Sequence, residues 1–348
     1  MDEFDVAIIG AGPVGLSAAI AAKRQGLSYV VLEKGIIANS IYHFPSNMVF
    51  FTTAELLEIG GHPFPSTGRK PTRQMALDYY RLIVKNEGLN VWLLHRVDSI
   101  DGNEGNFRIS GMNIRYHRET PFEIRAKYVV MATGYFDNPV GLGGIPGEDG
   151  PNVSHYYDDP HPYYGLDVVV VGAGNSGAEA ALELYRHGAN VTLIHRHPKP
   201  RETIKYWVAP DLMNRIAEGS IKALMPAEVV EIHLDHVVVT TPEGTRKVPA
   251  DHVFVLTGFR PNIKMLRALD LDLDTNGVAS LTTAYESSRD GLFLVGSVGF
   301  GKYTNAVFIE NGREHASIAM MEIAKRIKDP HYAPSRIPLE SKIKLTNL

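Results

Sequence analysis

The sequence predicts an α/β protein built from two Rossmann-like, dinucleotide-binding units. Three observations support this prediction. A glycine-rich turn lies between an apolar strand and a helix at residues 10–15, and the same arrangement returns at residues 172–177. The chain has 348 residues, which corresponds to two domains of about 150 residues each. A hydrophobic content of 44% supplies enough apolar side chains for two packed cores.

The first unit begins with the apolar run 5–9, which is typical of a buried parallel strand. The turn GAGPVG at residues 10–15 follows, then an alanine-rich helix over 16–25 and a second strand over 28–32. The first glycine of such a turn permits the bend, the second lets a pyrophosphate approach, and the third lets helix and strand pack closely. Glu33 ends the second strand, where a carboxylate can accept hydrogen bonds from ribose hydroxyls. We therefore expect a bound dinucleotide rather than a purely structural turn.

The second unit repeats this order. Its strand, its glycine-rich turn (GAGNSG), its helix and its second strand are expected at residues 167–171, 172–177, 178–187 and 190–194. The position equivalent to Glu33 holds His195, followed by Arg196 and, further on, Arg201. A carboxylate there would repel a ribose 2′-phosphate, whereas a His-Arg pair would bind it. The second site is therefore expected to bind NADPH, the alternative being a solvated basic loop.

Two sites of different selectivity predict electron transfer from NADPH to a second bound dinucleotide, for which FAD is the natural choice. Each unit is followed by a strand that ends in Thr-Gly, at 128–134 and 253–258. A last strand is expected at 291–296, and it also ends in glycine. A glycine at the carboxyl end of a strand faces the ligand crevice of an α/β sheet. A long helix over 306–327 is expected to begin beneath the flavin.

These arguments, with the family resemblance described below, assign residues to both cofactors. The residues expected at FAD are Gly10, Gly12, Pro13, Val14, Gly15, Glu33, Lys34, Asn39, Ser40, Ala132, Thr133, Gly134, Gly296 and Ser297. The residues expected at NADPH are Gly172, Gly174, Asn175, Ser176, Gly177, His195, Arg196, Arg201, Thr257 and Gly258. The aromatic residues Phe50, Phe51, Phe300 and Tyr303 either stack near the isoalloxazine or belong to the core.

Composition excludes several other classes. The net charge of −4 gives no reason to expect nucleic acid or an acidic membrane as partner. No apolar run reaches the ~18 residues of a membrane span, and the acidic start at residues 1–3 is unlike a signal peptide, so we expect a cytoplasmic protein. The chain contains no cysteine, which excludes disulfides, a CxxC redox pair, a cysteine nucleophile and zinc–thiolate sites. No metal site is expected, although four residues close in sequence offer a weak alternative: His155, Asp158, Asp159 and His161.

The motifs together resemble the two-dinucleotide-binding flavoproteins of the thioredoxin reductase type. Within that group the chain resembles the bacillithiol disulfide reductase (YpdA) family. The segments that carry this narrower resemblance lie at residues 39–60, 69–71, 132–139, 145–151, 155–165 and 308–315. The resemblance implies a homodimer or other homo-oligomer, and an FAD domain into which the NADPH domain is inserted. The expected bounds are 1–145 and 259–328 for the FAD domain, 146–258 for the NADPH domain and 329–348 for a tail.

Two cysteine features of these relatives are missing from the chain. Thioredoxin reductases carry a CxxC that is missing here, and bacillithiol disulfide reductases typically place a cysteine where this chain has Val14. Ser297 stands where many relatives have an aspartate, but the YpdA family lacks that aspartate too. Without a protein thiol, the flavin itself is expected to carry the chemistry. No catalytic side chain is assigned, and His43 is a candidate beside the flavin.

The expected function is an NADPH-dependent FAD oxidoreductase that passes a hydride from NADPH to FAD and then directly to an external acceptor. The acceptor implied by the resemblance is a low-molecular-weight disulfide, bacillithiol disulfide. The alternatives are a ferredoxin or flavodoxin–NADP reductase, a flavin monooxygenase, and a redox sensor without turnover. By analogy with ferredoxin–NADP reductases on this scaffold, Tyr332 of the tail is a candidate cover for the flavin; a tail that braces a dimer is the alternative.

Overall fold

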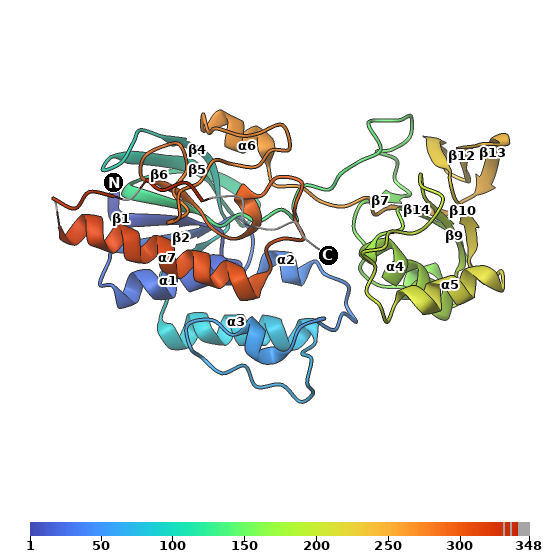
Figure 1. Cartoon of the computed structure of the whole chain (residues 1–348), viewed down its shortest axis with the longest axis horizontal. Coiled ribbons are helices and arrows are strands. Elements are labelled where there is room, and N and C mark those ends of the chain that lie inside the picture. Colours follow the sequence, from blue (N-terminus) through green and yellow to red (C-terminus); the bar gives the residue numbers. More distant parts are fainter. Residues whose placement is uncertain (330, 335, 340–348) are drawn as a thin grey trace. The chain divides into compact units, whose positions relative to one another are not determined.

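The structure, a computed structural model, describes residues 1–329, 331–334 and 336–339. The chain forms two compact units (Figure 1). Among the described residues, unit 1 comprises 1–42, 47–138 and 260–339, and unit 2 comprises 43–46 and 139–259. Each unit contains one of the two glycine-rich turns.

A seven-stranded sheet forms the centre of unit 1, in the order β3-β2-β1-β6-β5-β4, with β15 paired to β6. The strands are β1 (Asp2–Ile9), β2 (Tyr29–Glu33), β3 (Val91–Leu93), β4 (His95–Asp101), β5 (Phe107–Arg115), β6 (Arg118–Met131) and β15 (Leu292–Leu294). The first half of β6 pairs with β5 in an antiparallel hairpin, and its second half lies between β1 and β15 in parallel register. The carboxyl ends of β1, β6 and β15 therefore meet at one edge of the sheet.

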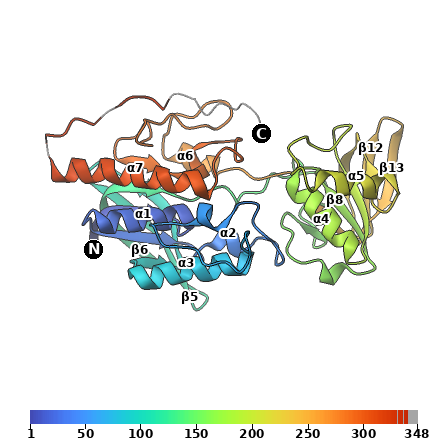
Figure 2. The ribbon, with the colours of Figure 1, turned by 60° about the horizontal axis from the view of Figure 1, so that its bottom comes forward.

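Helices pack on this sheet and cover its buried strands. They are α1 (Pro13–Arg24), α2 (Asn39–Tyr42), α3 (Arg73–Glu87), α6 (Ile263–Ala268) and α7 (Ile309–Lys328), with short 3-10 turns η1 (Ala54–Leu57) and η3 (Gly296–Gly299). Helices α1 and α7 lie side by side (Figure 2). Pro13 opens α1, where its missing N–H costs no hydrogen bond. One core cluster lies between the sheet and the 263–285 segment, which includes α6.

Unit 2 has three layers. Its five-stranded parallel sheet has the order β10-β9-β8-β14-β7. These strands are β7 (Val153–Ser154), β8 (Asp167–Val171), β9 (Asn190–Ile194), β10 (Lys222–Leu224) and β14 (His252–Val255). One face packs against α4 (Asn175–Arg186) and α5 (Ala209–Ala217), near the short turn η2 (His161–Tyr163). The other face packs against an antiparallel sheet of β11 (Glu228–Ile232), β12 (His236–Thr241) and β13 (Gly244–Pro249).

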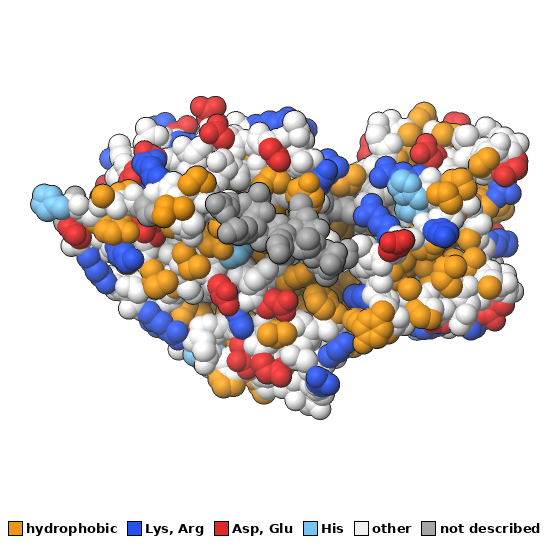
Figure 3. All heavy atoms as spheres, in the orientation of Figure 1, with side chains coloured by type: hydrophobic (Ala, Val, Ile, Leu, Met, Phe, Trp, Pro, Cys, Tyr) orange, Lys and Arg blue, Asp and Glu red, His pale blue; other side chains and the backbone are white. Residues whose placement is uncertain are grey.

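The predicted fold class is confirmed, since both strand–turn–helix units are present with bounds close to those expected. The predicted strand 253–258 ends earlier, at Val255, because the chain turns there toward Thr257 and Gly258. The long C-terminal helix begins at Ile309 rather than at residue 306, after Phe308. None of the helices in the described ranges combines the length and apolar character that a membrane crossing requires. On the face drawn in Figure 3, basic and acidic side chains are interspersed.

Candidate nucleotide-binding sites

The first glycine-rich turn leaves open space at the N-terminus of α1. Gly10 has a φ of +109°, and a Cβ there would lie 2.7 Å from the carbonyl oxygen of Ala132. A Cβ at Gly15 would overlap the carbonyl oxygen of Gly10, so both positions require glycine for close packing. A Cβ at Gly12, in contrast, would meet no atom within 4 Å. This bare backbone at a helix N-terminus fits a pyrophosphate, as the sequence predicts.

Glu33 fixes the shape of this turn. Its side chain is buried, and its Oε2 accepts a hydrogen bond from the backbone N–H of Ala11 at 2.8 Å. Its Oε1 accepts from the N–H of Gly35 at 2.7 Å. Burial raises the pKa of Glu33, and the two backbone donors counteract that shift. Each carboxylate oxygen keeps a lone pair that can accept a ribose hydroxyl.

The other residues expected at FAD surround this turn within unit 1. A Cβ at Gly134 would lie 3.9 Å from Ser297 Oγ, so the ends of β6 and β15 come close together. Asn39 begins α2 and packs over Gly35. Lys34 forms an ion pair of 2.9 Å with Asp137.

Val14 connects the turn to α7. A Cβ added at Gly312 would lie 2.8 Å from Val14 Cγ2, and one added at Gly296 would lie 3.3 Å from Val14 Cγ1. The first turn of α7 therefore lies directly against the first turn of α1. Sequence reasoning missed Gly312, and its signal was a glycine inside a helical run.

The second turn has the same architecture in unit 2. Gly172 has a φ of +112°, and a Cβ at Gly177 would overlap the carbonyl oxygen of Gly172. A Cβ at Gly174 would meet only the Cδ of Arg201, at 3.8 Å. Space at the N-terminus of α4 is therefore bordered by an arginine side chain. Thr257, at the neighbouring strand end, donates its hydroxyl to the carbonyl oxygen of Val140.

His195 occupies the place that Glu33 has in unit 1, but it differs in charge. Its side chain is only 5% exposed, and its Nδ1 lies 3.4 Å from the N–H of Ala173. Burial, together with the nearby His197, Arg201 and Arg196, lowers the pKa of His195 to about 4. The imidazole is therefore neutral near pH 7. Its Nε2 is buried and has no hydrogen-bond partner among the described residues, as expected of a group that a ligand completes.

The structure consequently divides the predicted His-Arg pair into two roles. His195 lies inside the turn as a neutral hydrogen-bonding group. Arg196 and Arg201 are exposed on the loop of residues 196–205, which we call the basic loop. The backbone N–H of Arg201 donates to the carbonyl oxygen of Ala173 at 2.9 Å, which ties this loop to the turn. Positive charge for a phosphate therefore comes from the two arginines and not from the histidine.

Several other candidates have different surroundings from those expected. His43 is grouped with unit 2, where the nearby Ser46 donates its hydroxyl to Asp159 Oδ2 at 2.6 Å. Among the residues that the structure describes, no three His, Asp or Glu side chains gather as metal ligands, so the weak metal alternative at residues 155–161 has no support. Asp159 Oδ1 instead accepts from the N–H of His161.

The aromatic candidates of unit 1 lie near α7. The rings of Phe51 and Phe308 meet edge to face at 5.3 Å. Phe300 is buried against His315. A cover over the flavin by Tyr332 is not supported, because the Tyr332 hydroxyl donates to Glu322 Oε2 at 3.0 Å. Glu322 lies roughly 15 Å along α7 from Gly312, the residue that lies against Val14.

Comparison with known proteins gives one family and several near relatives. The family described as pyridine nucleotide-disulphide oxidoreductase matches residues 7–296. Bacilliredoxin reductase Bdr of Bacillus subtilis (strain 168) is 38% identical over 92% of this chain and 97% of its own length. The solved structure of bacillithiol disulfide reductase Bdr (YpdA) from Bacillus cereus is 35% identical, with a TM-score of 0.90 over 93% of this chain and 100% of that one. The corresponding Staphylococcus aureus structure is 32% identical, with a TM-score of 0.86 over 94% of this chain and 100% of that one.

Proposed function

Because the chain belongs to the pyridine nucleotide-disulphide oxidoreductase family, we propose that it is an NADPH-dependent FAD oxidoreductase that reduces bacillithiol disulfide. Family membership makes it an enzyme that uses a flavin and a nicotinamide nucleotide, as the sequence predicted. The names of the relatives support the disulfide as acceptor. The observation that carries the proposal is the difference between two equivalent positions, Glu33 in unit 1 and His195 in unit 2.

The residues of unit 1 fit FAD. The open backbone at Gly12 accepts the pyrophosphate, and Glu33 accepts the ribose hydroxyls. Val14, Gly296 and Ser297 border the same space beside the first turn of α7. When bound, the flavin supplies the capacity to take up a hydride and to pass on two electrons.

The residues of unit 2 fit NADPH. Gly174 leaves room for the pyrophosphate at the N-terminus of α4, and Arg201 borders that room. Arg196 and Arg201 offer guanidinium groups that match the oxygens of a 2′-phosphate. His195 can donate its free Nε2–H to the ligand while remaining neutral.

The overall reaction must proceed without a protein thiol, since the chain contains no cysteine. One NADPH and one proton convert one disulfide into two thiols, so two electrons enter the sulfur–sulfur bond as it breaks. A protein-bound mixed disulfide is excluded as an intermediate. The acceptor must therefore meet the reduced flavin directly.

A homo-oligomer in the cytoplasm remains our prediction for the working form of the protein.

The acceptor is tested by following NADPH oxidation anaerobically with the purified, flavin-loaded protein. We expect turnover with bacillithiol disulfide and none with ferredoxin or flavodoxin. Turnover with the carrier proteins alone would overturn the proposed acceptor and favour a ferredoxin–NADP reductase, an alternative consistent with the missing cysteines. Rapid flavin reduction by NADPH, measured separately, would exclude a sensor without turnover.

The cofactor preference is tested with Arg196→Ala. Loss of charge-assisted hydrogen bonds should raise the KM for NADPH by about 10- to 100-fold, with little change in the KM for NADH. Arg186→Ala is a matched control, because Arg186 pairs with Asp211 on the helices of the same unit. Equal effects of Arg196→Ala on both nucleotides would contradict the assignment of a 2′-phosphate to this loop.

A further inference from the structure

We propose that Asn175 is a positioning residue that gives the second site its preference for a 2′-phosphorylated nucleotide. It does so by holding the basic loop against the N-terminus of α4. The proposal rests on the proposed function, because it assumes that unit 2 binds NADPH. It assigns the specificity partly to a side chain that carries no charge.

Asn175 uses both ends of its amide to bind the basic loop. Its Nδ2 donates to the carbonyl oxygen of Thr203 at 3.1 Å, and its Oδ1 accepts from the backbone N–H of Lys205 at 2.9 Å. Both bonds reach the loop backbone and not its side chains. The side chain of Asn175 therefore fixes the path of the loop whatever residues the loop presents.

Two further contacts tie the same loop to the same helix end. The N–H of Arg201 donates to the carbonyl oxygen of Ala173 at 2.9 Å. The ammonium of Lys205 pairs with Glu179 Oε1 at 2.6 Å. The backbone of Arg201 is thus held at Ala173 by its own N–H, and the residues after it are held by Asn175. The Cδ of Arg201 lies 3.8 Å from a Cβ built at Gly174.

The preference for a phosphate depends on where the arginines of the basic loop are held as well as on their charge. An untethered loop would keep its arginines, but a guanidinium discriminates between a phosphate and a hydroxyl only when its fork is held in register. The first α4 turn also offers unpaired N–H groups to an anion. Asn175 therefore brings the arginine and this helix end to one place.

Unit 1 lacks this tether at the equivalent position. Gly12 and Gly174 precede their helices in the same way, and Gly174 is followed by Asn175 whereas Gly12 is followed by Pro13. Proline has no side-chain amide and cannot tether a loop. The two sites thus differ together at two positions, Glu33 against His195 and Pro13 against Asn175. Both differences favour a phosphate in unit 2.

The test measures nucleotide binding to the flavin-loaded full chain by calorimetry. The probes are 2′,5′-ADP and 5′-AMP, applied to wild type, Asn175→Ala and Asn214→Ala. Asn214 is an exposed asparagine on α5 and is the matched control. We expect Asn175→Ala to weaken 2′,5′-ADP binding by about 10-fold and 5′-AMP binding by less than about 3-fold, so that the preference ratio falls. Asn214→Ala should match wild type.

The proposal is overturned if Asn175→Ala keeps the wild-type preference ratio, or if it weakens both probes equally. If the proposed NADPH site itself were wrong, the result would differ, because wild type would then bind 2′,5′-ADP and 5′-AMP equally well. Asn175→Asp provides a second variant of the same shape. It keeps the acceptor for Lys205 but places a carboxylate against the Thr203 carbonyl and beside the phosphate. A larger loss of 2′,5′-ADP binding than in Asn175→Ala is expected, and an unchanged ratio would again overturn the proposal.

Discussion

Glu33 and His195 show how one structural role can be filled by two different charges. Each is a buried side chain that accepts a hydrogen bond from the N–H of the second residue in its glycine-rich turn. Burial disfavours the charged form of both, so it raises the pKa of Glu33 and lowers that of His195 to about 4. Backbone donors counteract the shift for Glu33, whereas neighbouring cations reinforce it for His195. The difference in selectivity therefore starts from a neutral imidazole with arginines outside it.

Replacing Glu33 with alanine tests the first of these roles. Glu33→Ala leaves the N–H groups of Ala11 and Gly35 without acceptors and removes the partner of the ribose. Since each lost hydrogen bond is worth ~1 kcal/mol, we expect FAD to bind at least about 10-fold more weakly. The loss of FAD affinity is measured as the flavin content per chain after purification, and as the recovery of that content when FAD is added. Glu3→Ala, at an exposed position on β1, is the control. Unchanged flavin content in Glu33→Ala would rule out the ribose role.

The buried imidazole of His315 should make the stability of unit 1 depend on pH. Its ring stacks on Tyr285 at 4.0 Å, and burial lowers its pKa from the usual 6.5 to about 4. Between these values the unfolded chain binds a proton that the folded chain does not, so stability falls as the pH falls through this window. The contribution of His315 to the free energy of unfolding should fall by about 1–2 kcal/mol between about pH 7.5 and about pH 5.

The variant His315→Phe keeps an aromatic ring on Tyr285 and removes the titration. We expect the free energy of unfolding of this variant, measured with denaturant, to decrease less than that of wild type as the pH falls over the same range. His331→Phe, at an exposed position, should retain the wild-type slope. Identical slopes for wild type and His315→Phe would show that the buried imidazole does not contribute.

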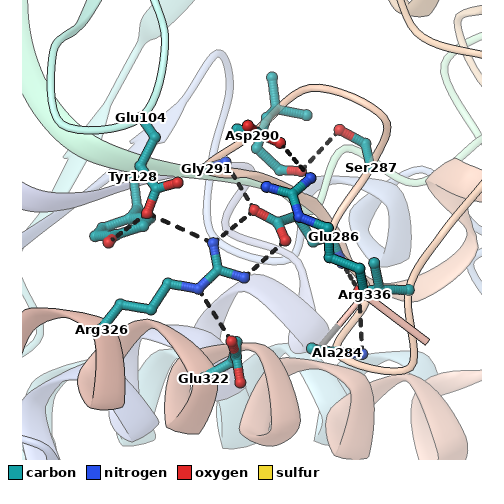
Figure 4. Close-up of polar contacts among 12 residues, drawn as sticks. Glu104, Tyr128, Ala284, Glu286, Ser287, Asp290, Gly291, Glu322, Arg326 and Arg336 are labelled. Carbon is teal, nitrogen blue, oxygen red and sulfur yellow. Dashed lines mark hydrogen bonds and ion pairs between the residues drawn. The ribbon is translucent and has the colours of Figure 1, made fainter. Parts of the chain in front are cut away.

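At the scale of elements, α7 has two differently built ends. Its first turn lies against α1 through Gly312 and Val14. Its last turns carry Arg326, which is bound on several sides in the interior (Figure 4). Two guanidinium nitrogens bind the two carboxylate oxygens of Glu286 at 2.7 Å, and Nε binds Glu322 at 3.0 Å. Glu286 also accepts from the N–H of Gly291, so this network joins α7 to the segment before β15.

Removing Arg326 should therefore destabilise unit 1 strongly. Arg326→Met leaves the carboxylate of Glu286, which is 1% exposed, without its cation, and we expect a loss of about 3–5 kcal/mol. Arg336→Met, which breaks an exposed pair with Asp290, should cost less than about 1 kcal/mol. Denaturant unfolding measures both. Adding Glu286→Gln to Arg326→Met should restore part of the loss, and a double variant no more stable than Arg326→Met would contradict this account.

The elements also show what sequence can predict. The two strand–turn–helix units were predictable because glycine spacing and apolar strands are local signals. The β11–β13 sheet was not predicted, although its strands alternate buried and exposed residues and follow one another through short turns, which are local signals as well. The place of Asn175 at the nucleotide stays a prediction, and sequence did not indicate that its side-chain amide binds Thr203 and Lys205. The burial of His195 was missed because spacing identifies a position but not its exposure.

At the scale of the whole molecule, the two units have separate cores. The cluster around Phe107 and Leu292 belongs to unit 1, and those around Val170 and Val237 belong to unit 2. The chain passes between the units next to residues 42, 46, 138 and 259. Each unit also has its own nucleotide turn. Stability and ligand binding should therefore be linked within each unit.

This linkage predicts two unfolding transitions in calorimetry of the flavin-loaded protein, because separate cores do not unfold as one two-state unit. A ligand that binds only the folded form of one unit adds about 2.7 kcal/mol to that unit at 100 times its Kd. We therefore expect excess 2′,5′-ADP to raise the transition of unit 2 alone, and removal of FAD to lower that of unit 1 alone. Arg196→Ala should abolish the first shift without affecting the second. A single transition that follows both ligands together would mean that the units unfold as one body, in which case either nucleotide stabilises the whole chain.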